Sequence, residues 1–418
     1  MTIMKKIKTN GNMHTVIDIG NSKVCCLIGT TDKNNQLQPK IIGFGQHVSQ
    51  GMISGKITNM KEITNSIARA VEGAEAMAGF AINKVTCNIS GGRPITKVFR
   101  NEITIQNRQI LKSDIIKIQK ENIPKKIDNY KLLSSSLIKF YIDNFMPVDN
   151  PIGLHARKLI LDMTYTYAED SVLKNITNAI NLCHLKVENF IITPEASGIA
   201  SVVQEEKKNG AIVIDLGGNL TSVGIFKNNN IIFSDTIPIG GVHITSDIVR
   251  GLGCKAEDAE KLKILHGSVI SNEIDEYQNI DAPIISDDGK IRSQIIPKAM
   301  LTAMIKPRIE EIFDLIKNRL SVLSITKDIE TIILCGGGAN LNDIKHLTNL
   351  YFKKNARIGY PVNIINDLPE IVENPTFSCL VGLLIKSLEE ENLTIALNDN
   401  SNFFNKFGRL GQWFDQNL

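Results

Sequence analysis

The sequence lacks any run of about 18 apolar residues, the length that a membrane-spanning helix needs. No apolar run follows its basic first segment, MTIMKKIKTN, so we expect no signal peptide. Its seven cysteines show no metal-ligand spacing and sit mostly in apolar runs, which is typical of buried thiols in a reducing compartment. A net charge of +3 on 418 residues gives no reason to expect a nucleic-acid partner. We expect a cytoplasmic globular protein with at least two domains.

What the chain does contain is one pattern that occurs twice. In AIVIDLGGNLTSVGIF, a buried-type strand ends at Asp215, glycines follow, and a second strand begins at Thr221. VIDIGNS repeats this around Asp18, 197 positions earlier (215 − 18). A single Asp-Gly pair is explained by an ordinary hairpin turn. The repeat favours two phosphate-binding turns, in which glycine N–H groups approach an anion and a carboxylate holds a hydrated cation. We therefore predict two similar domains that face one nucleotide.

Between and after these turns, helical periodicity and capping residues predict the main helices. They are 60–78, 171–183, 245–251, 256–265, 298–322, 341–352 and 377–388. Residues 89–159 form a small mixed unit that looks inserted, and the strand 158–167 is predicted to resume the first domain. The acidic segment 271–290 is predicted to be the least structured part of the interior. Pro307 should kink the long helix or mark a helix start.

The last 17 residues (418 − 402 + 1) have the pattern of an amphipathic helix. At about 100° per residue, six apolar residues share one face, and Trp413 lies beside that face near two cations. This arrangement is typical of a helix that lies in a membrane interface; the alternative is a C-terminal helix packed on its own core. The residues predicted to meet the membrane are Phe403, Phe404, Lys406, Phe407, Arg409, Leu410, Trp413 and Phe414.

Four elements stand in the order of the actin, Hsp70 and sugar-kinase superfamily. They are the two Asp-x-Gly turns, an Ala-Glu-x-x-Lys helix at 259–263, and a strand that runs into three glycines at 336–338. More closely, the chain resembles the bacterial FtsA family of cell-division proteins over essentially its whole length. The most specific stretches are 237–248, 150–154, 357–361 and the terminal helix.

The resemblance implies an α/β, actin-like two-domain fold with an inserted α+β subdomain and a C-terminal amphipathic helix. The expected units are a first domain (1–88 and 160–208), the inserted subdomain (89–159), a second core (209–241 and 331–388), an outer subdomain (242–330), a linker (389–401) and the tail (402–418).

The resemblance also implies a site for ATP and Mg²⁺. Its first phosphate turn would be Asp18, Gly20, Asn21, Ser22 and Lys23, and its second Asp215, Gly217 and Gly218. Asp18 and Asp215 would hold Mg²⁺ through water. Glu260 and Lys263 would meet the ribose, and Gly336, Gly337 and Gly338 the adenosine. For Glu260 and Lys263, a solvated pair at i, i+3 is the alternative.

Two departures from the family pattern bear on hydrolysis. The second turn carries Asn219, Leu220 and Ser222 where the family is richer in Gly and Thr. Thr193, not a glutamate, precedes Pro194, and Glu195 comes two positions late. Threonine cannot act as a carboxylate base, and loss of a general base typically costs ~10²–10⁴ in rate. We expect ATP binding with weak or absent ATPase activity, and we assign no catalytic residue.

The implied function is a filament protein that tethers the division ring to the cytoplasmic face of the plasma membrane. The implied partners are the C-terminal peptide of the tubulin-like division GTPase, other copies of this chain, anionic lipid and late division proteins. The peptide would dock on about 242–323, where Arg308 and Glu311 match family positions; a solvated pair is again the alternative. A sugar or acetate kinase is the rival, but it has no use for an amphipathic tail. An Hsp70-type chaperone needs a substrate domain after Leu388, and only 30 residues remain (418 − 388).

Overall fold

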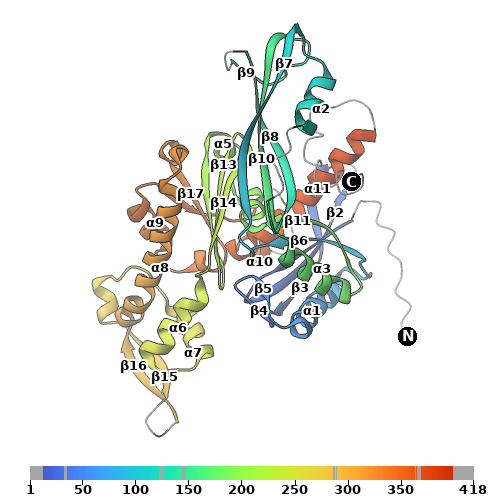
Figure 1. Cartoon of the computed structure of the whole chain (residues 1–418). Coiled ribbons are helices and arrows are strands. Elements are labelled where there is room, and N and C mark those ends of the chain that lie inside the picture. Colours follow the sequence, from blue (N-terminus) through green and yellow to red (C-terminus); the bar gives the residue numbers. More distant parts are fainter. Residues whose placement is uncertain are drawn as a thin grey trace.

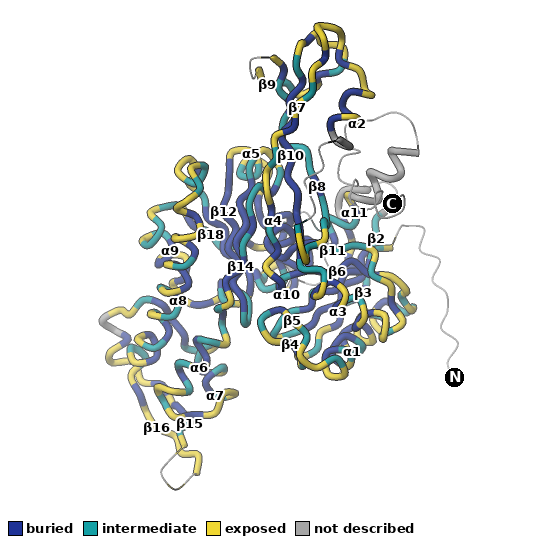
Figure 2. The backbone as a smooth tube through the Cα atoms, viewed as in Figure 1, coloured by how far each residue is buried: buried dark blue, intermediate teal, exposed yellow. Residues whose placement is uncertain are grey.

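The computed structural model describes residues 13–398, except for 33–34, 122–126, 144–145, 286–287, 289, 363 and 365–368. Two large sheets form the centre of the molecule (Figure 1). Buried residues concentrate in these sheets and exposed ones along the outer hairpins and helices (Figure 2). The predicted tail at 402–418, with its membrane residues from Phe403 to Phe414, lies outside the described residues.

The first sheet has five strands in the order β11-β6-β1-β2-β3. Alternation along β1 sends Ile17 and Ile19 toward helices α1 and α3, and Val16 toward α4 and α11 on the other face. The sheet is therefore covered on both sides. Its elements are β1 (Met13–Ile19), β2 (Lys23–Asp32), β3 (Asn35–Val48), β6 (Lys84–Ile89), β11 (Lys186–Ile192), α1 (Met60–Ala78), α3 (Asp170–Leu182), α4 (Thr193–Ser201) and α11 (Ser378–Asn398).

Helix α1 shows how local sequence sets an element's bounds. Asn59 caps its start by accepting a hydrogen bond from Glu62 N at 3.3 Å. Gly79 ends it at φ 81°, where its N–H donates to Glu75 O at 2.8 Å. The prediction of a helix over 60–78 is confirmed.

The second sheet has nine strands in the order β18-β17-β12-β13-β14-β7-β10-β8-β9. Helices α6, α8 and α9 pack on one face of its β12–β13 half. The bounds are β7 (Ile95–Gln109), β8 (Tyr130–Ile142), β9 (Met146–Val148), β10 (His155–Glu169), β12 (Ala211–Leu216), β13 (Thr221–Lys227), β14 (Asn230–Ile237), β17 (Thr331–Cys335), β18 (Asn355–Ile358), α5 (Gln204–Asn209), α6 (Gly241–Leu252), α8 (Lys298–Ser321) and α9 (Ile344–Phe352).

The inserted unit is larger than the sequence indicates. Strand β10 pairs with β7 and β8, not with the five-stranded sheet, so the prediction that 158–167 resumes the first domain is wrong. The unit therefore extends to Glu169. It joins the second domain through the pair Ser234–Thr96, where Thr96 Oγ1 lies 3.0 Å from both Ser234 Oγ and Thr166 Oγ1. Helix α2 (Lys112–Glu121) completes the unit.

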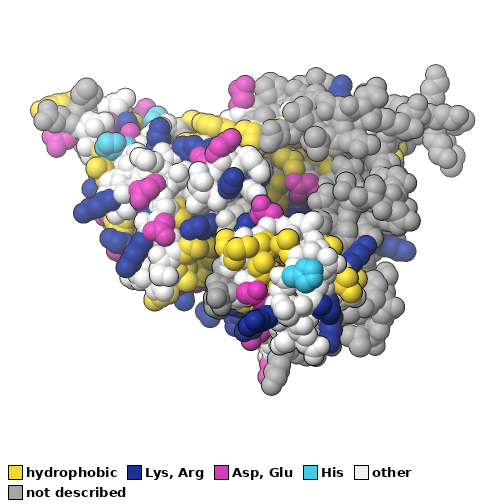
Figure 3. Space-filling view, turned by 90° about the horizontal axis from the view of Figure 1, so that it is seen from above, with side chains coloured by type: hydrophobic (Ala, Val, Ile, Leu, Met, Phe, Trp, Pro, Cys, Tyr) yellow, Lys and Arg dark blue, Asp and Glu magenta, His cyan; other side chains and the backbone are white. Residues whose placement is uncertain are grey.

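The free end of the inserted unit carries apolar side chains. Seen from above, hydrophobic side chains gather on this end of the molecule (Figure 3). Leu111, Ile116 and Leu154 are exposed there. Such a patch on a chain with a well-packed core often marks an interaction surface.

Two further predictions need correction, and a third, for Pro307, loses one of its two alternatives. The segment 271–290 is not a loop, because a 3₁₀ turn (Glu273–Glu276) and strand β15 (Asn279–Ile285) occupy it, with β15 paired to β16 (Ile291–Pro297). Helix α8 runs unbroken past Pro307, which therefore marks no helix start. Helix α11 continues to Asn398 through most of the expected linker 389–401. The remaining elements are α7 (Ala256–His266), α10 (Pro369–Val372), β4 (Met52–Ile53), β5 (Lys56–Ile57) and the 3₁₀ turns Ser324–Asp328, Gly337–Asn340 and Pro375–Phe377.

Candidate functional site

A cavity of about 500 Å³ lies between the two sheets. The β1–β2 turn and the β12–β13 turn face it from the two domains. Every residue predicted to meet the nucleotide or its metal lines this cavity. These are Asp18, Gly20, Asn21, Ser22, Lys23, Asp215, Gly217, Gly218, Glu260, Lys263, Gly336, Gly337 and Gly338.

The two turns have the same backbone geometry. Gly20 N donates to Lys23 O at 3.0 Å, and Gly217 N donates to Leu220 O at 3.0 Å. A Cβ atom on Gly20 or Gly217 would lie 2.9 Å or 2.8 Å from the accepting oxygen, so no larger residue fits without a shift. The repeated sequence pattern thus folds into a repeated structure.

Other backbone contacts hold the turns in place. Gly55 N donates to Asn21 Oδ1 at 3.0 Å, which braces the first turn against the β4–β5 hairpin. Gly241 N donates to Gly217 O at 2.9 Å, so the first residue of helix α6 is bound to the second turn. A Cβ on Gly218 would lie 3.3 Å from Ser22 Oγ, which shows how closely the two turns approach.

The carboxylates of the two turns are enclosed by the protein. Burial, and then repulsion from Asp215, raise the pKa of Asp18 to about 7. Burial raises the pKa of Asp215 to about 6, although Ser197 Oγ donates to its Oδ2 at 2.5 Å. Lys23 is the nearby cation, but burial lowers the pKa of its amine, which lies 3.8 Å from the centre of the Phe377 ring. The site therefore stabilises two carboxylate charges poorly by itself.

This donor set fits a hydrated divalent cation together with an anion. Mg²⁺ usually takes one or two carboxylates and completes its shell with water and phosphate oxygens. Glycines leave room for the rest of the ligand, since a Cβ on Gly337 would meet nothing within 4 Å. Gly336, at φ 82°, could carry no side chain, because its Cβ would lie 2.6 Å from Asp215 Oδ1.

Lys263 and Glu260 belong to a fixed cluster at the cavity wall. Lys263 Nζ donates to Glu260 Oε2 at 2.7 Å, Thr245 Oγ1 at 2.9 Å and Gly241 O at 3.0 Å. Its side chain is only 11% exposed. Lys263 is therefore not a solvated side chain, and its charge is held close to the second turn.

Comparison with known proteins places these features in a family. The family model for cell division protein FtsA matches residues 212–382. FtsA of Rhizobium meliloti (strain 1021) is 31% identical over 97% of this chain and 94% of its own length. The chain belongs to the FtsA family. FtsA of Agrobacterium fabrum is 30% identical over 97% of this chain and 94% of its own, and FtsA of Escherichia coli (strain K12) is 24% identical over 88% of each.

Solved structures show the wider fold. The PilM–PilN type IV pilus biogenesis complex matches with a TM-score of 0.62 at 14% identity, over 90% of this chain and 98% of that one. MreB5 of Spiroplasma citri bound to ADP matches with a TM-score of 0.57 at 14% identity, over 93% and 99%. The family model for type IV pilus assembly protein PilM also matches residues 16–275. The predicted actin-like fold is confirmed. Within the described part of the chain, no helix combines the length and apolarity that crossing a membrane requires.

Thr193, which stands in place of the expected catalytic base, has a structural role in this FtsA-family chain. Thr193 opens helix α4 at the cavity, and its Oγ1 accepts from Asn88 Nδ2 at 3.3 Å. Glu195 does not line the cavity and lies 3.7 Å from Lys386. Burial raises the pKa of Glu195. The geometry gives Glu195 no access to a ligand in this cavity.

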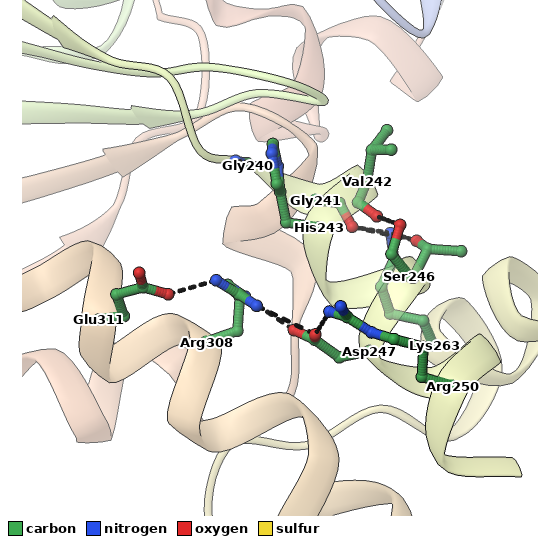
Figure 4. A network of polar contacts seen from close by, with 11 residues as sticks. Gly240, Gly241, Val242, His243, Ser246, Asp247, Arg250, Lys263, Arg308 and Glu311 are labelled. Atoms are coloured by element: carbon green, nitrogen blue, oxygen red, sulfur yellow. Dashed lines mark hydrogen bonds and ion pairs between the residues drawn. The ribbon is translucent and has the colours of Figure 1, made fainter.

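Arg308 and Glu311 lie on α8 in the outer subdomain and contact each other, as their spacing predicts. Arg308 has a second partner that the spacing does not reveal. Its Nε and Nη2 donate to the two carboxylate oxygens of Asp247 on α6, at 2.7 Å and 3.0 Å. Asp247 is also paired with Arg250 (Figure 4). Arg308 is therefore held inside the subdomain, with 22% of its side chain exposed.

Several cavity residues were not predicted. Asn88, Ser90, Asn340, Thr376 and Cys379 also line the wall. Only Asn340, which closely follows the glycine run, carries a signal that could have been used. The others come from strand β6, the loop after it, a 3₁₀ turn and helix α11, whose distances from the turns depend on the tertiary fold.

We expect Asp18→Asn to stabilise the nucleotide-free protein at pH 8, measured as Tm in EDTA. The folded pKa of Asp18, about 7, is above its ordinary value of 3.8, so the folded state binds more protons between these values and loses stability as pH rises. The gain from the substitution should be on the order of 2 kcal/mol at pH 8 and should vanish near pH 4.

Asp162→Asn is the control of opposite sign. It breaks the pair with Arg100 at 2.7 Å and should lower Tm at pH 8. An Asp18→Asn protein whose Tm matches wild type at pH 8 would show that the Asp18 charge is not penalised.

Proposed function

We propose that this chain is an ATP-binding, actin-like filament protein that anchors the cell-division ring to the cytoplasmic face of the plasma membrane and recruits later division proteins. The observation that carries the proposal is the pair of matching carboxylate–glycine turns on one cavity. Membership of the FtsA family supports the division role. MreB5, a structural neighbour described with ADP and with AMPPNP, supports a nucleotide as the ligand.

In this proposal, different cavity residues bind different parts of the nucleotide. Backbone N–H groups of the two turns and Lys23 meet the phosphates, and Asp18 and Asp215 hold Mg²⁺ through water. Glu260 and Lys263 meet the ribose, and the glycines at 336–338 meet the adenosine. Mg²⁺ neutralises phosphate charge and adds the positive charge that the two carboxylates lack.

The rival function, a small-molecule phosphotransferase, needs a base aimed at an acceptor hydroxyl. Among the described lining residues the carboxylates are Asp18, Asp215 and Glu260. Glu260 is engaged by Lys263 and Thr245, and the other two carry the raised pKa values of the proposed metal site. This arrangement favours binding over transfer.

Asp215→Ala should weaken binding of Mg·ATP by about tenfold or more, because it removes a carboxylate that holds the cation. Titration with a fluorescent ATP analogue measures the change. Glu257→Ala removes an exposed carboxylate of α7 and is the matched control, with affinity as in wild type. Equal affinity in wild type and Asp215→Ala would count against the site.

The proposed anchor is the tail, whose residues lie outside the described range. Burying one large apolar side chain is worth ~1.5–3 kcal/mol, and part of this gain offsets the cost of ordering the helix. A single tail should therefore bind lipid weakly. A filament joins many tails, which can raise avidity by ~10²–10⁴ without new contacts.

Trp413→Glu should release the protein from anionic liposomes in a co-sedimentation assay and leave nucleotide binding intact, because it places a charge beside the apolar face. Trp413→Phe keeps an aromatic ring and should still pellet. If Trp413→Glu pellets with lipid as wild type does, the tail is not the anchor.

The outer subdomain is the proposed dock for the C-terminal peptide of the tubulin-like GTPase, with Arg308 and Glu311 as contacts. Because the Arg308 guanidinium is already hydrogen-bonded to Asp247, a carboxylate of the peptide must compete with Asp247 for this group. The apolar end of the inserted unit is the proposed contact for late division proteins.

We expect Arg308→Ala to lower peptide affinity by about tenfold, and Asp247→Asn to raise it, because Asn removes the carboxylate charge at Nε and Nη2 of Arg308 and leaves Glu311 as its one described acidic partner. Fluorescence anisotropy with the labelled peptide measures both. Arg319→Ala, on the same helix and 60% exposed, is the control. Wild-type affinity in Arg308→Ala would remove Arg308 from the contact.

A further inference from the structure

One amide on the cavity wall has an orientation that its neighbours determine. Asn340 ends the 3₁₀ turn Gly337–Asn340, two positions after the last residue of the glycine run. It lines the cavity together with Thr376 and the apolar side chains Ile264 and Leu341. Ile264 and Leu341 suit contact with the faces of a flat ring. Asn340 is a polar group that lies close to these two side chains in the fold.

The orientation of Asn340 follows from that of Asn374. Thr376 N donates to Asn374 Oδ1 at 3.0 Å, so this atom must be the oxygen of the Asn374 amide. Asn340 Nδ2 then donates to Asn374 Oδ1 at 3.2 Å and to Thr376 Oγ1 at 3.0 Å. Turning the Asn340 amide over would place its oxygen against the Asn374 oxygen. Both N–H groups of Asn340 therefore point toward the Asn374–Thr376 segment.

This leaves Oδ1 as the one polar atom of Asn340 that a ligand can use. No described residue donates a hydrogen bond to it. A carbonyl oxygen accepts and cannot donate. Of the purines, adenine offers an exocyclic amine at C6, whereas guanine and hypoxanthine present a carbonyl oxygen there, and two facing acceptors repel each other.

We propose that Asn340 selects adenine by accepting a hydrogen bond from its exocyclic amine, and that Asn374 and Thr376 act as positioning residues for this amide. The proposal rests on the proposed nucleotide site and adds base specificity to it. The rotation of the Asn340 amide is blocked. A base without the amine therefore leaves Oδ1 unpaired, which costs more binding free energy than the loss of one contact.

The test compares Mg·ATP with the Mg²⁺ complex of purine riboside triphosphate, which lacks only the amine, by equilibrium titration. Wild type should prefer ATP by roughly 10-fold to 100-fold. Asn340→Ala should lose most of this preference, because it removes both the hydrogen bond to the ATP amine and the acceptor that the purine analogue leaves unpaired. Asn340 is exposed, so the alanine variant should fold.

Thr376→Val provides a second, nearly isosteric variant. It removes one of the two acceptors that hold the Asn340 amide, and the preference for ATP over inosine triphosphate should fall because Asn374 alone then opposes rotation of the amide. A full preference for ATP in Asn340→Ala would overturn the assignment. If wild type bound ATP and purine riboside triphosphate equally, the assignment would be overturned, but the nucleotide site would remain supported. Failure to bind either would overturn the site and this inference together.

Discussion

Two carboxylates that face one cavity from different sheets are the constraint on which this structure depends. Asp18 and Asp215 occupy matching positions at strand ends, each followed by a turn that only glycine can form. Their raised pKa values show that burial disfavours the charged forms of both carboxyl groups. In the proposed function a divalent cation would offset that cost, and because each half of the molecule supplies one carboxylate, the cation would link the two halves.

The second turn also connects the cavity to the outer subdomain. Helix α6 begins at Gly241, whose N–H is bound to Gly217 O. Six residues later the same helix carries Asp247, which holds Arg308 on α8. One short helix therefore touches the phosphate turn at its start and the predicted partner contact in its middle. A ligand that shifts the second turn would act through this rigid helix on the contact between Asp247 and Arg308.

Local signals in the sequence were sufficient for part of this structure. The capping residue Asn59 and the glycine after Ala78 determine α1, and the repeated Asp-x-Gly pattern identifies both turns. The pairing of strands could not be predicted from local signals of this kind. Strand β10 reads as any buried strand, and its partners are decided by a sheet that spans both domains. Strand β15 was missed because its exposed side carries Asn279 and Asp281, residues typical of loops.

The candidate site shows the same limit. Glycines and aspartates at strand ends can be recognised in the sequence, because few other residues fit those positions. The hydrogen-bond partners of Asn340 and Lys263 could not be predicted in this way, because they lie far away in the chain, as Asn374 and Gly241 do. The partner of Arg308 is likewise 61 positions away, beyond the reach of helical spacing.

The central claim is that the two turns grip one nucleotide between the domains. An experimental structure of the full chain with Mg²⁺ and a non-hydrolysable ATP analogue tests it most directly. We expect triphosphate density between Gly20 and Gly217, with the cation bridged through water to Asp18 and Asp215 and the adenine amine beside Asn340. Nucleotide density elsewhere, or phosphates in contact with only one of the two turns, would contradict it.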